Sequence, residues 1–81
     1  MAKAKKKVKE KPSYSILIMS SQREQLFYFD CDSPFGIKFV FDHFLNRFRN
    51  GKNVICFRYD GDLYETVFDK NTINWVQEIY G

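Results

Sequence analysis

Residues 33–51 read SPFGIKFVFDHFLNRFRNG, and this stretch predicts the helix around which the rest of the chain is organised. Ser33 is a suitable N-cap, and Pro34 stands at the first helical position, where its missing N–H is not needed. Apolar residues then recur at spacings of three and four, which places them on one helix face: Ile37, Val40, Phe41, Phe44 and Phe48. Gly51 favours the left-handed conformation that follows a helix end. We therefore expect an amphipathic helix over residues 34–49.

Two short strands are predicted before this helix. Residues 14–19 alternate in such a way that Tyr14, Ile16 and Ile18 share one strongly apolar face. After a polar turn, residues 25–31 are rich in aromatic side chains, as is typical of strands. We expect this second strand to pair antiparallel with the first.

A hairpin is predicted after the helix. Residues 53–59 and 62–68 flank Asp60-Gly61, a pair that favours a type I′ turn because both central positions need a positive φ. Residues 72–80 are expected to form a fifth strand, with a short terminal helix as the alternative. The predicted fold class is α+β, a small antiparallel sheet with the order ββαβββ along the chain and one helix packed on a face.

Positive charge is concentrated at the N-terminus of the 81-residue chain, whose formal net charge is +3. Six lysines stand against Glu10 in residues 1–11, giving +5, whereas residues 12–81 contain seven basic and nine acidic residues, giving −2. The six are Lys3, Lys5, Lys6, Lys7, Lys9 and Lys11. We expect residues 1–13 to form a flexible, disordered arm in front of a single domain of residues 14–81.

A basic arm on a mildly acidic body suggests a polyanionic partner. The first hypothesis is association with DNA or RNA, in which the arm's lysines contact phosphates without reading sequence. Arg47, Arg49 and Lys52, at the end of the predicted helix, would add to these contacts. Aromatic residues of the predicted hairpin could also stack on bases, although we expect the face with Phe57 and Tyr64 to pack against the helix as core.

A second hypothesis is binding to another protein. Phe39 falls on the polar side of the predicted helix, and Phe35 is one turn before it, so the two could form an apolar spot that a buried core does not explain. Either this spot meets a partner, or the first helical turn is irregular and Phe35 folds inward. Trp75 lies in the expected fifth strand, and at a sheet edge this strand could pair with a second chain to give a homodimer. The alternative, which we favour, is that Trp75 caps the core from the end.

Catalysis is not expected. His43 is the sole histidine of the chain, and neighbouring Asp42 points about 100° away from it on a helix, so the two cannot form a triad-like pair. The aspartate pairs at 30/32 and 60/62 are explained by a helix start and a turn, and we expect no metal and no cofactor.

The cysteines and the N-terminus suggest a cellular location. Cys31 and Cys56 lack metal-binding spacing and suggest reduced thiols. The chain shows neither a secretion signal nor an apolar stretch long enough to span a membrane. We therefore expect a cytoplasmic protein that does not insert into membranes.

Two segments carry a resemblance to known proteins, FLNRFRNG at residues 44–51 and NTINWVQEI at residues 71–79. Together with the lysine-rich start, they make the chain similar to small orphan proteins of bacteriophages and their bacterial hosts. That resemblance implies a regulator or inhibitor with a host protein as its partner.

Overall fold

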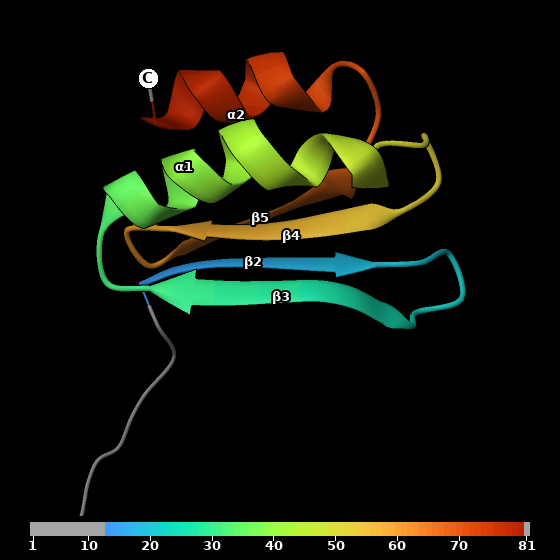
Figure 1. The fold of residues 1–81 in the computed structure, drawn as a ribbon, viewed down its shortest axis with the longest axis horizontal. Coiled ribbons are helices and arrows are strands. Elements are labelled where there is room, and N and C mark those ends of the chain that lie inside the picture. Colours follow the sequence, from blue (N-terminus) through green and yellow to red (C-terminus); the bar gives the residue numbers. More distant parts are fainter. Residues whose placement is uncertain (1–12, 81) are drawn as a thin grey trace, which may run out of the picture.

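The computed structural model describes residues 13–80, which form a four-stranded antiparallel sheet with two helices on one of its faces (Figure 1). The predicted lysine arm falls on residues 1–12 and therefore lies outside the described residues. The elements follow the chain in this order: β2 (Tyr14–Met19), β3 (Gln25–Cys31), α1 (Pro34–Phe44), a 3₁₀ turn η1 (Leu45–Phe48), β4 (Val54–Tyr59), β5 (Asp62–Val67) and α2 (Thr72–Tyr80). The strand order in the sheet is β3-β2-β4-β5.

The strand pairings confirm the predicted hairpins. Ile16 of β2 faces Phe29 of β3 on one side and Phe57 of β4 on the other, and both pairings are antiparallel. In the second hairpin Phe57 faces Tyr64, as the two-residue turn predicts. The turn itself has φ values of 53° at Asp60 and 89° at Gly61, both positive as a type I′ turn requires.

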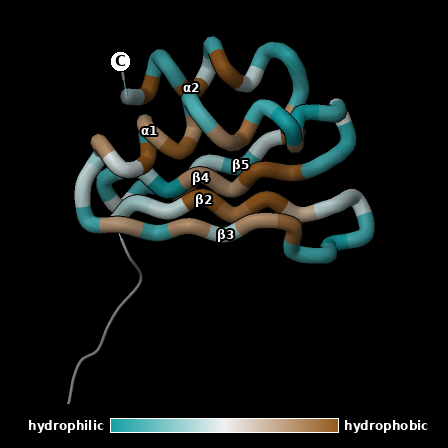
Figure 2. The backbone as a smooth tube through the Cα atoms, in the orientation of Figure 1, coloured by the Kyte–Doolittle hydropathy of each residue, from teal (hydrophilic) through white to brown (hydrophobic). Residues whose placement is uncertain are grey.

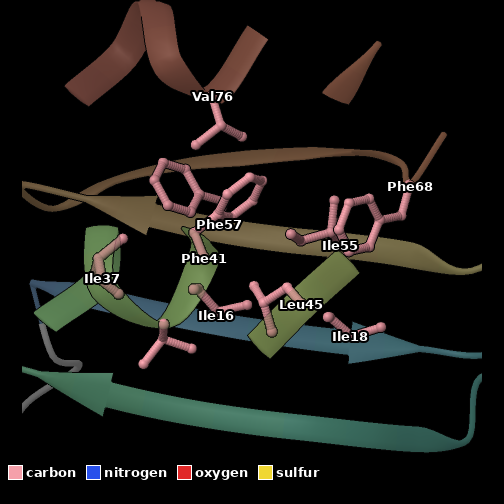
Figure 3. Packing of buried hydrophobic residues seen from close by; sticks show 10 residues of the cluster. Ile16, Ile18, Ile37, Phe41, Leu45, Ile55, Phe57, Phe68 and Val76 are labelled. Atoms are coloured by element: carbon pink, nitrogen blue, oxygen red, sulfur yellow. The ribbon is translucent and has the colours of Figure 1, made fainter. Parts of the chain in front are cut away.

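The hydrophobic core lies between the sheet and the two helices (Figure 3). The central strands β2 and β4 supply much of it, and Figure 2 shows their hydrophobic residues beside hydrophilic turns. Its ten buried members are Ile16, Ile18, Ile37, Val40, Phe41, Leu45, Ile55, Phe57, Phe68 and Val76. The hairpin face with Phe57 and Tyr64 therefore packs against the helices, as expected, and the Phe57 ring is fully buried.

The first helix is shorter than predicted. It ends at Phe44, and the 3₁₀ turn η1 continues to Phe48. Since a 3₁₀ helix has three residues per turn, it rotates the following side chains relative to an α-helix. Leu45, four residues after Phe41, is fully buried, whereas Phe44, which we expected in the core, is 50% exposed. Ser33 occupies the N-cap position with an extended backbone but makes no side-chain capping hydrogen bond.

Residues 72–80 form a helix and not the expected fifth strand, so the element order is ββαββα. Thr72 begins α2, and its Oγ1 donates a hydrogen bond to the Val67 carbonyl at 3.0 Å and accepts one from the Asp69 amide at 3.1 Å. Val76 is fully buried, and Ile73 and Tyr80 also pack against the core. A helix makes its own backbone hydrogen bonds, and at this position it covers β4 and β5. Helix α1 alone does not cover these two strands.

Candidate functional site

Five phenylalanines form an apolar surface along α1 and β3, which we call the aromatic surface: Phe27, Phe29, Phe35, Phe39 and Phe44. Phe35 is 81% exposed, Phe39 55% and Phe44 50%. Phe27 and Phe29 point to the helix side of β3 and are half-buried. The structure thus places the two predicted residues, Phe35 and Phe39, on a larger surface than the sequence indicated.

A groove of about 350 Å³ runs between α1 and β3 at the centre of this surface. Its lining contains no charged or polar side chain: Phe27, Phe29, Gly36, Phe39, Val40 and Phe44. Gly36 allows α1 to lie this close to β3, because a Cβ atom there would be 2.8 Å from Cys31 Sγ. The Cys31 thiol in turn donates a hydrogen bond to the Ser33 carbonyl at 3.1 Å, just before the helix.

The rings of Phe39 and Phe44 are held in place by contacts on their own helix. The Phe39 ring stacks on the His43 ring with centroids 4.6 Å apart and contacts Phe44 edge-on at 5.8 Å. His43 Nδ1 donates a hydrogen bond to the Phe39 carbonyl at 2.9 Å. A ring that is already ordered loses less conformational entropy when a partner covers it.

Trp75 is not on an edge strand, so its predicted pairing with another chain through that strand is wrong. It lies in α2 and is half-buried, with its ring centroid 5.8 Å from that of Tyr64 and 6.4 Å from that of Phe57. These contacts place Trp75 over the hairpin as a partly exposed member of the core periphery.

Exposed cations gather at one end of the sheet, which we call the basic end: Arg23, Arg47, Arg49 and Lys52. Arg23 and Lys52 line the same pocket beside Met19, the last residue of β2. Arg47 and Arg49 flank Phe48, whose ring lies 5.6 Å from that of Phe27 near the start of β3. Arg23, which sequence spacing did not connect with the predicted trio, therefore lies beside Lys52, whereas Arg49 lines a different pocket with Asp42 and Ile73. The six lysines of the predicted nucleic-acid site lie outside the described residues.

The opposite end of the sheet is acidic. Asp30, Asp32 and Asp60 line one pocket together with Ser13 and Tyr14; we call this the acidic end. Burial, and next the charge of Asp60, raises the pKa of the Tyr14 hydroxyl. Within residues 13–80 no three metal-ligating side chains come together in a group that could hold an ion.

The sheet face turned away from the helices carries a second set of apolar side chains. Leu26, Tyr28, Leu63 and Val67 are each between 42% and 56% exposed on this face. Arg58 and Glu65 interrupt the set on β4 and β5, so it is less continuous than the aromatic surface.

No protein family, curated protein or solved structure compared with this chain matches it. None of the helices in residues 13–80 is long and apolar enough to cross a membrane. The surfaces described above are therefore the basis on which function is inferred.

Proposed function

We propose that this protein is a non-enzymatic protein-binding module that takes an apolar partner surface on the aromatic surface of α1 and β3. The observation that carries the proposal is the exposure of Phe39 and Phe44, which line a groove with a wholly apolar lining. Phe35, one helix turn before Phe39, is also exposed. Contiguous apolar patches of this kind on small domains mark interaction sites, whereas single exposed apolar residues do not.

The energetics favour a protein partner. Full burial of a phenylalanine side chain contributes about 1.5–3 kcal/mol relative to leaving it in water. Three largely exposed rings therefore offer enough apolar area to act as anchors, and aromatic anchors typically dominate interface energetics. A charged polymer such as nucleic acid gains little from a groove that offers no cation and no hydrogen-bond donor.

The test uses the tagged full chain to capture a partner from a nuclease-treated cell lysate. The cells that supply the lysate also produce an untagged copy of the chain. The variants are the double substitution Phe35→Ala, Phe39→Ala and the matched control Leu63→Ala. Leu63 is 56% exposed and Phe39 is 55% exposed, so the control removes a comparably exposed apolar side chain from a different surface.

We expect the wild type and Leu63→Ala to retain a stoichiometric partner that the double variant loses. Alanine is a strong helix former, so circular dichroism should show an intact fold for the double variant. Capture that is unchanged by the double substitution would contradict the proposal.

A second candidate function, sequence-independent contact with DNA or RNA, is favoured by the charge distribution. Residues 1–11 carry +5, and Arg47, Arg49 and Lys52 are all exposed at the basic end. About six phosphate contacts would give a log–log salt dependence with a slope near −4 to −5.

Binding to an oligonucleotide measured over a salt series tests this second function. We expect binding at low salt that is strongly weakened by removal of residues 1–11. The triple substitution Arg47→Ala, Arg49→Ala, Lys52→Ala should reduce the salt slope further. Absence of binding at low salt, or binding that survives the deletion unchanged, would reject this function.

A further inference from the structure

We propose that the partner of the aromatic surface is a second copy of this chain, joined by antiparallel pairing of the two β3 strands at the free edge of the sheet. This inference rests on the proposed protein-binding function, because it names the protein that covers the same surface. The resulting sheet would be continuous across the two copies, with all four helices on one face.

The first argument is that β3 is an edge strand with little of the usual protection, apart from a register irregularity at its start, opposite Ile18 and Met19. Among residues 13–80 it pairs with β2 on one side and with nothing on the other. Its seven residues, QLFYFDC, contain no lysine, arginine or proline, and the carboxylate of Asp30 accepts a hydrogen bond from the Tyr28 hydroxyl at 2.9 Å. The other edge, β5, has Asp62 and Glu65 within six residues. Proteins usually block edge pairing with charges, so a largely apolar and aromatic edge strand favours pairing with a strand of another chain.

The second argument is that β3 is complementary to itself. Side chains alternate between the two faces of a strand. When two β3 strands pair antiparallel about a twofold axis that passes through one residue and its counterpart, the helices of both copies therefore lie on the same face of the sheet. With Tyr28 at the axis, Phe27 faces Phe29 of the second copy, and Phe29 faces Phe27. These aromatic pairs lie on the helix side, where cross-strand aromatic contacts stabilise a sheet.

The third argument is the groove beside the strand. Phe39 and Phe44 stand along the side of α1 that lines this groove above β3. Across the twofold axis they would meet the same residues of the second copy, and the two apolar grooves would close on each other. An apolar lining without polar groups is well matched by another copy of itself, because no hydrogen-bonding group is left without a partner.

The fourth argument is charge. Strand β3 begins after Arg23 and Glu24 at the basic end and finishes at Asp30 and Asp32 at the acidic end. The four cations of the basic end outnumber its carboxylates, Glu24 and Glu65. Antiparallel pairing places the basic end of each copy beside the acidic end of the other, whereas parallel pairing would bring like charges together. The same arrangement brings Ser13, where the lysine-rich segment joins the domain, toward the basic end of the second copy.

The experiment measures the molar mass of the full chain by light scattering during size-exclusion chromatography, over a wide range of protein concentration. The disrupting variant is Tyr28→Lys, which places two lysines opposite each other at the axis. Tyr28 is 47% exposed on the open face, so the substitution is tolerated by the single chain. The matched control is Leu63→Lys, the same added charge on the other edge strand.

We expect twice the chain mass for the wild type and for Leu63→Lys, and a single chain mass for Tyr28→Lys. The dimer should weaken in high salt, because screening reduces the attraction between the two ends. Hydrogen exchange of the wild type gives an independent check that needs no variant. Amides of residues 25–31 should become more protected as concentration rises, whereas those of β5 should not change.

A wild type that stays at one chain mass at every concentration overturns the inference, as does a dimer that persists in Tyr28→Lys. The proposed function is judged separately by the capture experiment. A monomer that still captures another protein through Phe35 and Phe39 removes this inference and leaves the function standing. A monomer that captures no protein contradicts both the proposed function and this inference.

Discussion

The Tyr80 hydroxyl donates a hydrogen bond to Asp42 Oδ1 at 2.8 Å and thereby joins the two helices across 38 residues of sequence. The Tyr80 ring also packs edge-on against the buried ring of Phe41, with centroids 6.3 Å apart. Lys38 Nζ lies 5.8 Å from the centre of the Tyr80 ring on the same side of α1. The C-terminal helix is thus attached to α1 by its last described residue as well as by the core.

The substitution Tyr80→Phe tests this link. We expect the free energy of unfolding to fall by about 0.5–1 kcal/mol, the net value of one hydrogen bond, because the ring packing is kept. Urea denaturation followed by circular dichroism measures the change. An unfolding free energy that stays the same would show that the bond is matched by hydration in the unfolded chain.

Because of Tyr80, we also expect the stability of the protein to depend on pH in the alkaline range. Burial, and next the hydrogen bond to Asp42, raises the pKa of Tyr80 above its ordinary value of 10.0. The unfolded chain therefore releases this proton at a lower pH than the folded chain, and the contribution of Tyr80 is complete below pH 10 and is lost as the pH rises further. The wild type should lose stability more steeply than Tyr80→Phe above about pH 10. Parallel curves for the two proteins would contradict the raised pKa.

Gly36→Ala should destabilise the protein although alanine is the better helix former. The new Cβ would lie 2.8 Å from Cys31 Sγ, and one of the two segments must shift. Overpacking of this kind costs typically about 1–3 kcal/mol, which exceeds the gain in helix propensity of about 1 kcal/mol.

The double variant Gly36→Ala, Cys31→Ala is the control for this clash, because it removes the sulfur. We expect it to recover part of the lost unfolding free energy, as measured in a double-mutant cycle. Additive losses would show that the close approach of α1 to β3 is not the cause.

Gly61→Ala should weaken the β4–β5 hairpin. Gly61 has a φ of +89°, and nothing lies within 4 Å of the position that a Cβ atom would take, so strain and not a clash decides the effect. A left-handed conformation costs a residue with a Cβ roughly 1–2 kcal/mol. Asp60→Asn, which keeps a residue suited to positive φ, should change stability by less than about 0.5 kcal/mol. Thermal unfolding of both variants provides the comparison.

Thr72→Val should destabilise the start of α2 by about 1–3 kcal/mol. Thr72 is 2% exposed, and the valine would keep its shape while removing the hydroxyl. The Asp69 amide and the Val67 carbonyl would both lose their partner at this hydroxyl. Thr72→Ser keeps the hydroxyl and should retain more of the stability. A Thr72→Val variant as stable as the wild type would show that the hydrogen bonds of the hydroxyl contribute nothing to stability.

Local signals in the chain were sufficient for the elements that depend on them. The turn at Asp60-Gly61 follows from the conformations those two residues favour, and it sets the register of Phe57 against Tyr64. The start of α1 at Pro34 is likewise local. The apolar spacing of Ile37, Val40 and Phe41 correctly predicted the buried face, since these residues lie within three turns of regular helix.

The prediction from the sequence was wrong where contacts between distant segments decide which side chains are buried. Phe44 continues the apolar spacing of α1, but Leu45 is buried in its place. The aromatic surface was only partly foreseen, because Phe27 and Phe29 join Phe39 through the contact of α1 with β3. Gly36 was the available signal, since a glycine inside a helix often marks a close approach.

The sequence by itself determined two hairpins, one amphipathic helix and a separation of charge between residues 1–11 and the rest, because each depends on residues near one another in the chain. Residues 72–80 contain β-branched and aromatic residues that suit a strand, and their apolar spacing suits a helix equally well. Only the tertiary structure decided between these, because Phe57 and Tyr64 need a covering layer beside α1 that a helix supplies. The tertiary structure also placed β3 at the edge of the sheet beside the phenylalanines of α1, and that position joins phenylalanines distant in the sequence into one apolar surface.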